Sequence, residues 1–512
     1  MRLRKRHLGL VLCSGLACAV ALGGMVAVQA AAGGKPIARY TTKGAWSFVS
    51  EPKLHPPKLA PDISVSYRKL AGGDFFLTNF RNVNLNSPMV GQSGPMILDN
   101  HLRPVWFLPI GTHLLSADLK LQTYNGKPAL SWWQGTISRV GETLSGQLVL
   151  VDNTYKQVAK ITAPSPWVIS LHDAVVQGTN VWVTVYRQVS QSLTKYHGPA
   201  KGTVLDSAFQ EYDLKTGKLL YTWDALGHIP LSDSYASIVK KTPWDAYHVN
   251  SLQLVSSNEM LVSMRNTWAA YLVDTTTGKT IWTLGGKHSS FKPKTPYHFQ
   301  HDVELHHGDV VSAFDDNCCN QTGPSAFDKP FGPSRGVVLK LDFKHHTVSQ
   351  SAQYKHGTLV SAFLGNTQLL SNGNVVIGWG SQPLFSEYSR KGKLLDDVKW
   401  PSPDQSYRAY VEKWTATPYF PPSGAVKTKS GRTTVYASWD GATEVASWEV
   451  MGGSSATSLK VVAKAGKSAF ETAIALSKSY KFYKVLALDK QKKVLGTSSL
   501  FPTTSGPGGG FY

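Results

Sequence analysis

Short apolar stretches with alternating polar positions run along most of the chain, and turn residues separate them. One pattern recurs six times: an apolar strand ends in Asp or Ser, a turn follows, and a second strand often carries Trp. The first strand of the six copies ends at Asp99, Asp152, Asp213, Asp274, Asp342 and Ser389. These end residues are 53, 61, 61, 68 and 47 positions apart. Each copy is typical of the outer hairpin of a four-stranded sheet. The pattern therefore predicts an all-β, six-bladed β-propeller, with a large sandwich or a solenoid as the alternative.

Polar residues occupy near-equivalent positions in an earlier strand of four consecutive repeats. The segments are Leu171-His172-Asp173, Tyr247-His248-Val249-Asn250, Gln300-His301-Asp302 and Gly365-Asn366-Thr367. Each polar residue precedes a turn by six to eight positions, and an apolar strand follows that turn. Because the innermost strands of a propeller line its central channel, we expect three histidines and two asparagines to face one pocket.

The chain changes character after Tyr410. Prolines at 418, 421 and 422 precede five short alternating strands, which resemble a small immunoglobulin-like or fibronectin type III β-sandwich. We expect a signal peptide at residues 1–30, an extended segment at 31–70, the propeller at 71–415, the sandwich at 416–502 and a flexible Gly-rich tail at 503–512.

The residue pattern at the N-terminus predicts that the protein is exported. Basic residues from Arg2 to Arg6, an apolar stretch from Leu8 to Val28 and small residues up to Ala30 form a signal peptide with cleavage near Ala30. The expected destination is the periplasm or the extracellular space. A lipoprotein attached through Cys18 and an uncleaved anchor are the alternatives, and we expect no integral membrane span in the mature chain.

Composition and charge exclude several classes of protein. Of the 512 residues, 42% are hydrophobic and 17% are charged, which argues against both a polytopic membrane protein and a disordered chain. The net charge of +20 is spread thinly, without a Lys/Arg tract after the first ten residues. We therefore expect no nucleic-acid partner, although the charge favours anionic ligands or surfaces. The mature chain retains only Cys318 and Cys319, a local loop feature rather than a disulfide framework.

The predicted pocket has the chemistry of an anion-handling site. A neutral imidazole can act as a nucleophile, and a second imidazole can protonate a leaving oxygen. Arg265, His248 and Asn250 can donate hydrogen bonds to the oxygens of a sulfuryl or phosphoryl group. Metal binding by the three histidines is a competing interpretation. We expect no metal, because Asp173 and Asp302, each beside a histidine, are expected to face away from the pocket. Five other histidines (His306, His307, His345, His346 and His356) are expected on the surface or in the core.

Strings of residues along nearly the whole chain resemble the bacterial arylsulfotransferase family, specifically its actinobacterial-type branch. They include Gly94-Pro95-Met96-Ile97-Leu98-Asp99, His248-Val249-Asn250-Ser251, Ser263-Met264-Arg265-Asn266-Thr267, Gln300-His301-Asp302, Ser334-Arg335-Gly336, Ser406-Tyr407-Arg408 and Ala437-Ser438-Trp439-Asp440-Gly441. One such string is weak evidence; their number and order make the resemblance specific.

The resemblance implies transfer of a sulfuryl group from a phenolic sulfate ester to a phenol, with no cofactor and no nucleotide donor. In this family a histidine is transiently sulfated in a ping-pong cycle, and the Gln-His-Asp segment implies that His301 is this nucleophile. It also implies that His248, Asn250 and Arg265 hold the sulfuryl oxygens and that His172 exchanges a proton with the phenolic oxygen. We further expect Asn366 and Arg335 to bind substrate. Three aromatic residues, Trp182, Trp268 and Phe314, are candidates for stacking on the aryl group.

Two segments depart from the family pattern. Leu171-His172-Asp173 is the least family-like of the inner segments, and the loop from Phe314 to Cys319 carries an extra acidic residue and the cysteine pair. The rival functions are a quinoprotein-type dehydrogenase and a non-enzymatic binding or scaffold propeller of the envelope. The natural donor and acceptor and the oligomeric state are left open.

Overall fold

The computed structural model describes residues 40–503, apart from residues 64–65, 67–68, 83–86, 112, 139–141, 240–241, 320, 324–325 and 328–329. The expected signal peptide at 1–30 lies outside the described residues, as do positions 31–39 of the expected extended segment and positions 504–512 of the expected tail.

β-Strands dominate the described residues, and the helices are single turns. The helical turns are α1 (Ala225–His228), η2 (Thr194–Tyr196), η3 (Leu231–Asp233) and η4 (Arg265–Thr267). Within the described ranges, no helix has the length and apolar character that crossing a membrane requires. Two small pairs lie outside the main sheets: β1 (Tyr40–Thr41) with β4 (Met89–Val90), and β21 (Gln321–Gly323) with β22 (Ala326–Phe327).

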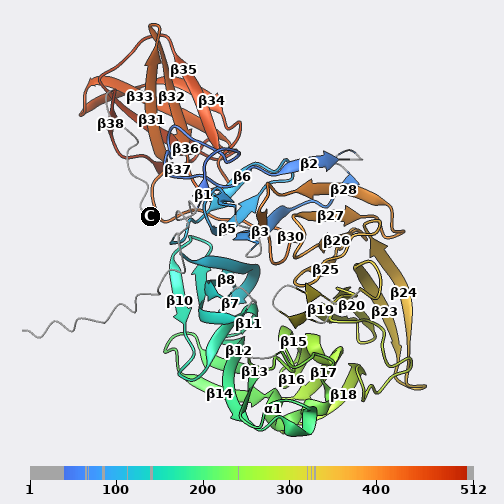
Figure 1. Ribbon diagram of the computed structural model, residues 1–512. Coiled ribbons are helices and arrows are strands. Elements are labelled where there is room, and N and C mark those ends of the chain that lie inside the picture. Colours follow the sequence, from blue (N-terminus) through green and yellow to red (C-terminus); the bar gives the residue numbers. More distant parts are fainter. Residues whose placement is uncertain are drawn as a thin grey trace, which may run out of the picture. The chain divides into compact units, whose positions relative to one another are not determined.

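Six antiparallel sheets of the described chain follow one another around a common centre, which is the arrangement of a β-propeller (Figure 1). The first contains β3 (Asp74–Arg81), β5 (Gly94–Leu98) and β6 (Pro104–Phe107), together with β29 (Asp404–Gln405) and β30 (Tyr410–Glu412). The second contains β7 (Leu115–Tyr124), β8 (Lys127–Ile137), β9 (Thr143–Asp152) and β10 (Gln157–Ile161). The third contains β11 (Val168–Gln177), β12 (Asn180–Gln191), β13 (Gly202–Asp213) and β14 (Leu219–Asp224).

The other three sheets have the same order of strands. The fourth contains β15 (Val249–Ser256), β16 (Glu259–Met264), β17 (Ala269–Asp274) and β18 (Thr280–Gly285). The fifth contains β19 (His301–His306), β20 (Val310–Asp315), β23 (Arg335–Asp342) and β24 (Thr347–Lys355). The sixth contains β25 (Asn366–Leu369), β26 (Val375–Gly378), β27 (Leu384–Tyr388) and β28 (Leu394–Lys399), with β2 (Ala60–Ile63) on its outer edge.

Segments from both ends of the ring complete each other's sheets. β30 pairs with β3, with Asp74 opposite Glu412, while β2 pairs with β28, with Ala60 opposite Lys399. The chain before the first sheet therefore extends the last sheet, and the chain after the last sheet supplies the inner strands of the first.

The recurrent Asp of the sequence pattern lies at the end of the third strand of a sheet and holds the following turn. Asp213 Oδ1 accepts hydrogen bonds from the Thr216 backbone N–H and hydroxyl, both at 2.7 Å. Asp274 Oδ1 accepts one from the Thr276 N–H at 2.8 Å. A short carboxylate that bonds the backbone two or three residues ahead stabilises a tight turn, which explains why Asp recurs there.

Carboxamides on the inner strands fix the position of the next inner strand. Gln253 on β15 accepts from the Leu305 N–H at 2.7 Å and donates to the Leu305 carbonyl at 3.0 Å. Gln368 on β25 bonds the N–H and carbonyl of Val411 in the same way, at 2.8 and 3.2 Å. Each amide satisfies one donor and one acceptor of a neighbouring sheet and so sets the register between sheets.

Four inner strands carry bulges, and in β11, β15 and β19 the bulge lies at residues that the sequence singled out. Register shifts occur in β7, β11, β15 and β19, and three residues there have left-handed backbones: Asp118 (φ 56°), His248 (φ 61°) and Asp302 (φ 52°). Asp and His are among the residues that adopt this conformation most readily. Bulges redirect side chains next to functional sites, and here they sit at the candidate site.

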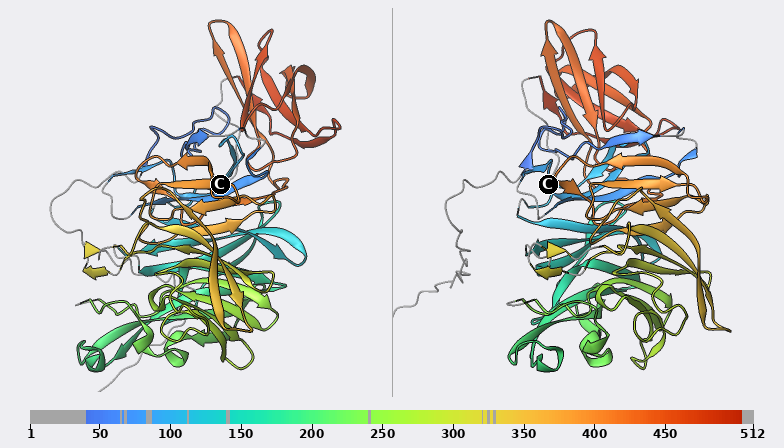
Figure 2. Two further views of the ribbon diagram at one scale, coloured as in Figure 1. Left: turned by 90° about the vertical axis from the view of Figure 1, so that its right-hand side faces the viewer. Right: turned by 45° about the vertical axis from the view of Figure 1, so that its right-hand side comes forward.

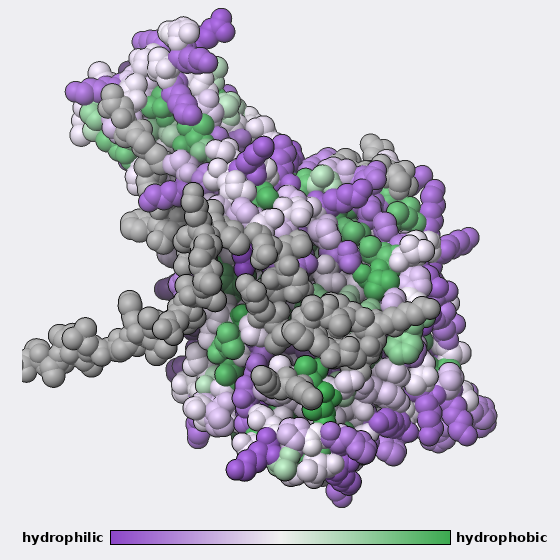
Figure 3. All heavy atoms as spheres, viewed as in Figure 1, coloured by the Kyte–Doolittle hydropathy of each residue, from purple (hydrophilic) through white to green (hydrophobic). Residues whose placement is uncertain are grey.

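The strands after Ser423 form a group of their own, orange to red in Figure 2. One sheet contains β31 (Ser423–Lys429), β32 (Arg432–Ser438) and β35 (Glu471–Leu476). The other contains β33 (Ser447–Ser455), β34 (Ser458–Gly466), β36 (Phe482–Leu488), β37 (Val494–Thr497) and β38 (Phe501–Pro502). The sheets share one core, which includes Val435, Trp448, Ile474 and Tyr483. On the face seen in Figure 3, hydrophilic side chains gather along the outer margins, and hydrophobic side chains show in smaller patches between them.

Candidate active site

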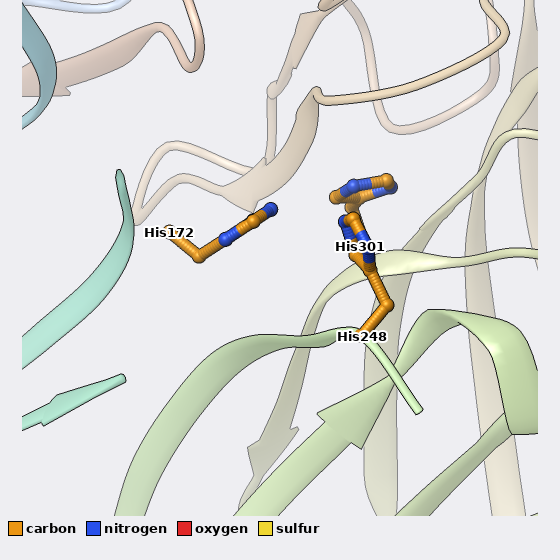
Figure 4. Close-up of side chains that lie close together, drawn as sticks. All are labelled: His172, His248 and His301. Carbon is orange, nitrogen blue, oxygen red and sulfur yellow. The ribbon is translucent and has the colours of Figure 1, made fainter. Parts of the chain in front are cut away.

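Three histidines from three successive sheets lie together. His172 lies on β11, His248 directly precedes β15 and His301 begins β19. The ring centroids of His172 and His248 are 4.8 Å apart, and His301 lies 6.5 and 6.4 Å from them (Figure 4). The His172 and His301 side chains are buried, whereas the His248 side chain is 21% exposed. The expected convergence of the three histidines is therefore present, and the site is approached past His248.

A neighbouring oxygen faces Nδ1 of each ring. The partners are Ser170 Oγ at 2.6 Å for His172, Asp245 Oδ2 for His248 and Asp316 Oδ1 at 3.2 Å for His301. These contacts leave Nε2 of His172 and Nε2 of His248 for a ligand. The Leu364 N–H donates to Nε2 of His301 at 3.3 Å, so this nitrogen is an acceptor. His301 therefore fits the tautomer that has its proton on Nδ1 and its lone pair on Nε2.

The surroundings keep two of the rings neutral. Burial, followed by the charges of Arg265 and His248, lowers the pKa of His301 well below its ordinary value. Burial, followed by His248 and Arg408, lowers the pKa of His172 in the same way. A neutral imidazole has a free lone pair, so at neutral pH both rings can act as nucleophile or base.

Arg265 supplies a buried positive charge beside this group. It begins η4, at the end of β16, and its guanidinium donates to Asn266 Oδ1 and to the Ala362 carbonyl, both at 2.9 Å. Its Nε lies 3.5 Å from Asp316 Oδ2, and its guanidinium lies 4.5 Å from the Phe299 ring centroid. Burial raises the pKa of Asp316 well above its ordinary value, and Arg265 opposes this shift. Arg265 and His301 thus share one carboxyl group.

Asn250 lies near the histidines but bonds the protein backbone. Its Nδ2 donates to the Gln300 carbonyl at 2.7 Å, directly before His301. Its Oδ1 is buried and has no hydrogen-bond partner among the described residues. This oxygen is a polar atom that Asn250 leaves open to a ligand.

The other two predicted substrate contacts have partners elsewhere. Both ends of the Asn366 carboxamide bond the Ala409 backbone, at 2.8 and 2.9 Å. Arg335 bonds Asp315 at 2.8 Å and also Gln350 and Gln353, so its recorded bonds do not reach the three histidines. The substrate contacts of Asn366 and Arg335 stay predictions.

A buried charge cluster, which we name the axial charge cluster, lies next to the histidines. Its centre is Arg408, whose Nη1 lies 3.1 Å from Asp118 Oδ1, 3.3 Å from Asp173 Oδ2 and 3.3 Å from Asp302 Oδ1. Arg408 Nη2 donates to the Asn250 carbonyl at 2.9 Å, and Lys120 lies 2.8 Å from Asp173. Burial raises the pKa of Asp118 to about 7, against the opposing effect of Arg408. Asp173 and Asp302 therefore belong to this cluster rather than to the group of histidine nitrogens.

Sequence reasoning missed the residues that orient the histidines. Ser170, Asp245 and Asp316 had no assigned role, and Arg408 appeared only within a family-like string. Two of them could have been found from the sequence, because Ser170 and Asp245 lie only two and three residues before the histidines that they contact. The extra acid of the loop after Phe314 was noted, and it supplies the Nδ1 partner of His301.

The three aromatic candidates have different environments. Trp182 packs between sheets against Phe209 and Tyr221 and donates to Gln177 at 3.0 Å. Phe314 is buried against Trp379. Trp268 follows η4, stacks on Tyr235 at 3.6 Å between ring centroids and is half-buried. Trp268 also makes edge contacts with His298, Phe299 and Phe331, and among the three candidates it is the least buried.

Cys318 and Cys319 are joined to each other by a disulfide and are buried in the loop that follows Asp316. The Cys319 carbonyl lies 3.5 Å from Arg265 Nη2. The pair is thus part of the wall beside Arg265, as a local loop feature.

Comparison with solved structures finds several proteins at low similarity, β-propeller domains among them. A protein of unknown function from Bacteroides caccae is 12% identical, with 67% of this chain and 100% of that chain covered and a TM-score of 0.39. The quinohemoprotein alcohol dehydrogenase of Comamonas testosteroni is 12% identical, with 69% and 62% covered and a TM-score of 0.29. The Swd1 β-propeller domain of Myceliophteria thermophila is 8% identical, with 82% and 100% covered and a TM-score of 0.34. At these scores we base no conclusion on the likenesses.

No curated protein matches the sequence. The model of the arylsulfotransferase (ASST) family matches residues 120–399, which is more than half of the chain and includes the three histidines, their Nδ1 partners and Arg265. This chain therefore belongs to the arylsulfotransferase family.

Proposed function

We propose that the protein is an exported aryl sulfotransferase, which moves a sulfuryl group from a phenolic sulfate ester to a phenol through a sulfohistidine on His301. The observation that carries the proposal is the environment of His301: a buried imidazole, with Nδ1 on Asp316 and an acceptor Nε2, beside two further histidines and Arg265. We also propose six blades within residues 71–415 and a C-terminal sandwich of the fibronectin type III kind at 416–502.

In the first half-reaction, the Nε2 lone pair of His301 attacks the sulfur of the ester. The bond from sulfur to the aryl oxygen breaks, and the phenolate leaves with its electron pair. The sulfated imidazole then carries a positive charge, which its Nδ1–H shares with Asp316. The leaving phenolate takes a proton from solvent, or from His172 when that ring is protonated.

In the second half-reaction, the acceptor phenol gives its proton to neutral His172 and its oxygen attacks the sulfur. The bond between sulfur and Nε2 breaks, and the electron pair returns to His301. Arg265, His248 and Asn250 are the proposed contacts of the sulfuryl oxygens, Asn250 through the Nδ2 hydrogen that the Gln300 carbonyl does not use. Positive charge there stabilises the charge that builds on these oxygens in the transition state.

The test is incubation of the purified protein with 4-nitrophenyl sulfate, with and without phenol. We expect phenol-dependent release of nitrophenolate and a sulfuryl adduct on His301 by mass spectrometry, both lost in His301→Ala. His345→Ala is the matched control, because His345 is exposed and pairs with Asp342. A folded protein that gives neither release nor adduct across a panel of donors would favour the non-enzymatic scaffold instead.

A further inference from the structure

The three histidines form a more complete arrangement than a nucleophile alone requires. One nitrogen of each ring lies within 4.8 Å of one nitrogen of each other ring. Nδ1 of each ring contacts Ser170, Asp245 or Asp316, which leaves Nε2 as the nitrogen that faces a ligand. Metal-binding histidines have this construction, in which the second ring nitrogen bonds a carboxylate or another oxygen that fixes the orientation of the ring.

We propose that His172, His248 and His301 bind a divalent transition-metal ion, Zn²⁺ or Cu²⁺, which occupies the nucleophile and reversibly blocks sulfuryl transfer. The inference shares its site with the proposed function and rests on it for the inhibitory effect, whereas the binding of the ion stands independently. The sequence argued against a metal because it showed no carboxylate ligand. In the structure the carboxylates lie behind the rings instead, on Asp245 and Asp316.

The donor set selects the class of ion. Three imidazole nitrogens suit Zn²⁺ and Cu²⁺, whereas Ca²⁺ and Mg²⁺ require oxygen ligands. Bonds of about 2.0–2.1 Å to a tetrahedral zinc place the nitrogens about 3.3 Å apart, so the rings must move inward from their present separation. This movement also takes Nε2 of His301 away from the Leu364 N–H, which now donates to it at 3.3 Å. The fourth position is left for water or an anion, which enters past the partly exposed His248.

The charges around the site indicate an exchangeable ion rather than a resident one. Asp245, which contacts Nδ1 of His248, offsets the charge of a cation. Arg265, which lies 3.5 Å from Asp316, repels it. An ion held under these opposing effects leaves when a sulfate ester or a chelator competes for the same atoms.

Binding is tested on the full exported chain, treated with a chelator, dialysed and kept under non-reducing conditions. Calorimetric titration with Zn²⁺ alone should show one ion per chain, and Co²⁺ should give the visible bands of a four-coordinate site. Alanine at any of the three histidines should abolish both signals. Asp245→Asn should weaken Zn²⁺ binding by about 10- to 100-fold, because it changes only an orienting group.

The control for binding is His345→Ala, which changes an exposed histidine outside the site and should leave the titration unchanged. Thermal unfolding of every variant shows whether it is folded. Binding that survives all three histidine substitutions, or that is absent from the folded wild-type protein, would overturn the inference.

The inhibitory effect is tested with 4-nitrophenyl sulfate. Zn²⁺ should raise the apparent KM for the ester without changing kcat, and a chelator should restore full activity. Zn²⁺ binding at the three histidines in a protein without transfer activity would refute the proposed function and leave the metal site standing. Transfer without Zn²⁺ binding would refute the metal site alone. Activity lost on chelation and restored by Zn²⁺ would make the ion a cofactor and overturn the blocking effect.

Discussion

At the scale of single residues, the contact at Nδ1 decides which nitrogen of each histidine can react. The Asp316 contact and the Leu364 N–H together define Nε2 of His301 as the reactive atom. The sequence predicted the three histidines because repeat positions converge on an axis. It did not predict Asp316, because this residue reaches His301 from the loop after the second strand of the same sheet, and no repeat marks that loop.

Replacing Asp316 with Asn tests this positioning role. The amide replaces the carboxyl group that accepts from the Nδ1–H of the sulfated ring and can turn an N–H toward Nδ1, which favours the wrong tautomer. We expect kcat with 4-nitrophenyl sulfate to fall about 100-fold, with little change in KM. The matched control is Asp342→Asn, which removes an exposed partner of His345. An unchanged kcat in the folded Asp316 variant would show that the contact is structural only.

The acid side of the pH profile tests the neutral rings. His301 must be unprotonated to attack, and its pKa is lowered from the ordinary value of 6.5, with burial as the main cause. A lowered pKa means that protonation, and with it the loss of the nucleophile, begins only at more acidic pH. We expect kcat/KM for 4-nitrophenyl sulfate to be retained below pH 6.5 and to fall at lower pH. A midpoint above 6.5 would contradict the assigned environment.

At the scale of strands and sheets, contacts between residues close in sequence can be predicted, whereas contacts between distant residues cannot. The outer hairpins were predictable because Asp213 and Asp274 bond turn residues two or three positions ahead. The carboxamide contacts between sheets were not, because Gln253 bonds a residue 52 positions away, Leu305. The polar residue Asn366 was predicted to bind substrate, yet both of its observed bonds join two sheets.

Gln253→Ala tests the contribution of such a contact. The substitution leaves the N–H and carbonyl of Leu305 without their amide partner in a part-buried position. An unsatisfied buried group costs about 1–3 kcal/mol, so we expect the free energy of unfolding to fall by roughly 2 kcal/mol. Denaturant unfolding followed by fluorescence measures the change. Gln188→Ala, which removes an exposed bond to Glu142, should have little effect.

At the scale of the whole molecule, one segment closes the ring and completes the site. Arg408 lies between β29 and β30, the strands that pair with β3, and it contacts aspartates of three other sheets. The sequence predicted the ring from its repeats. It did not predict the axial charge cluster, because the three aspartates are brought together by Arg408, which comes from a distant segment of the chain.

Arg408→Met tests the axial charge cluster. It leaves three buried carboxyl groups without their shared cation, which costs about 3–5 kcal/mol. We expect a lower Tm at neutral pH. The deficit should shrink as the pH falls, because the carboxyl groups then take up protons and lose their charge. Arg432→Met, at an exposed position, is the control. A Tm equal to that of the wild-type protein would contradict the role given to Arg408.

The pairing of β30 with β3 also determines when the site can form as the molecule folds. Asp74 and Glu412 face each other across more than three hundred intervening residues. Bringing such distant ends together carries a large entropic cost, and contacts of this kind form slowly. Six sheets can therefore assemble from local hairpins while the pocket still lacks Tyr407 and Arg408. In a refolding experiment, catalytic activity would report the completed ring, and it would return later than the bulk of the β-structure.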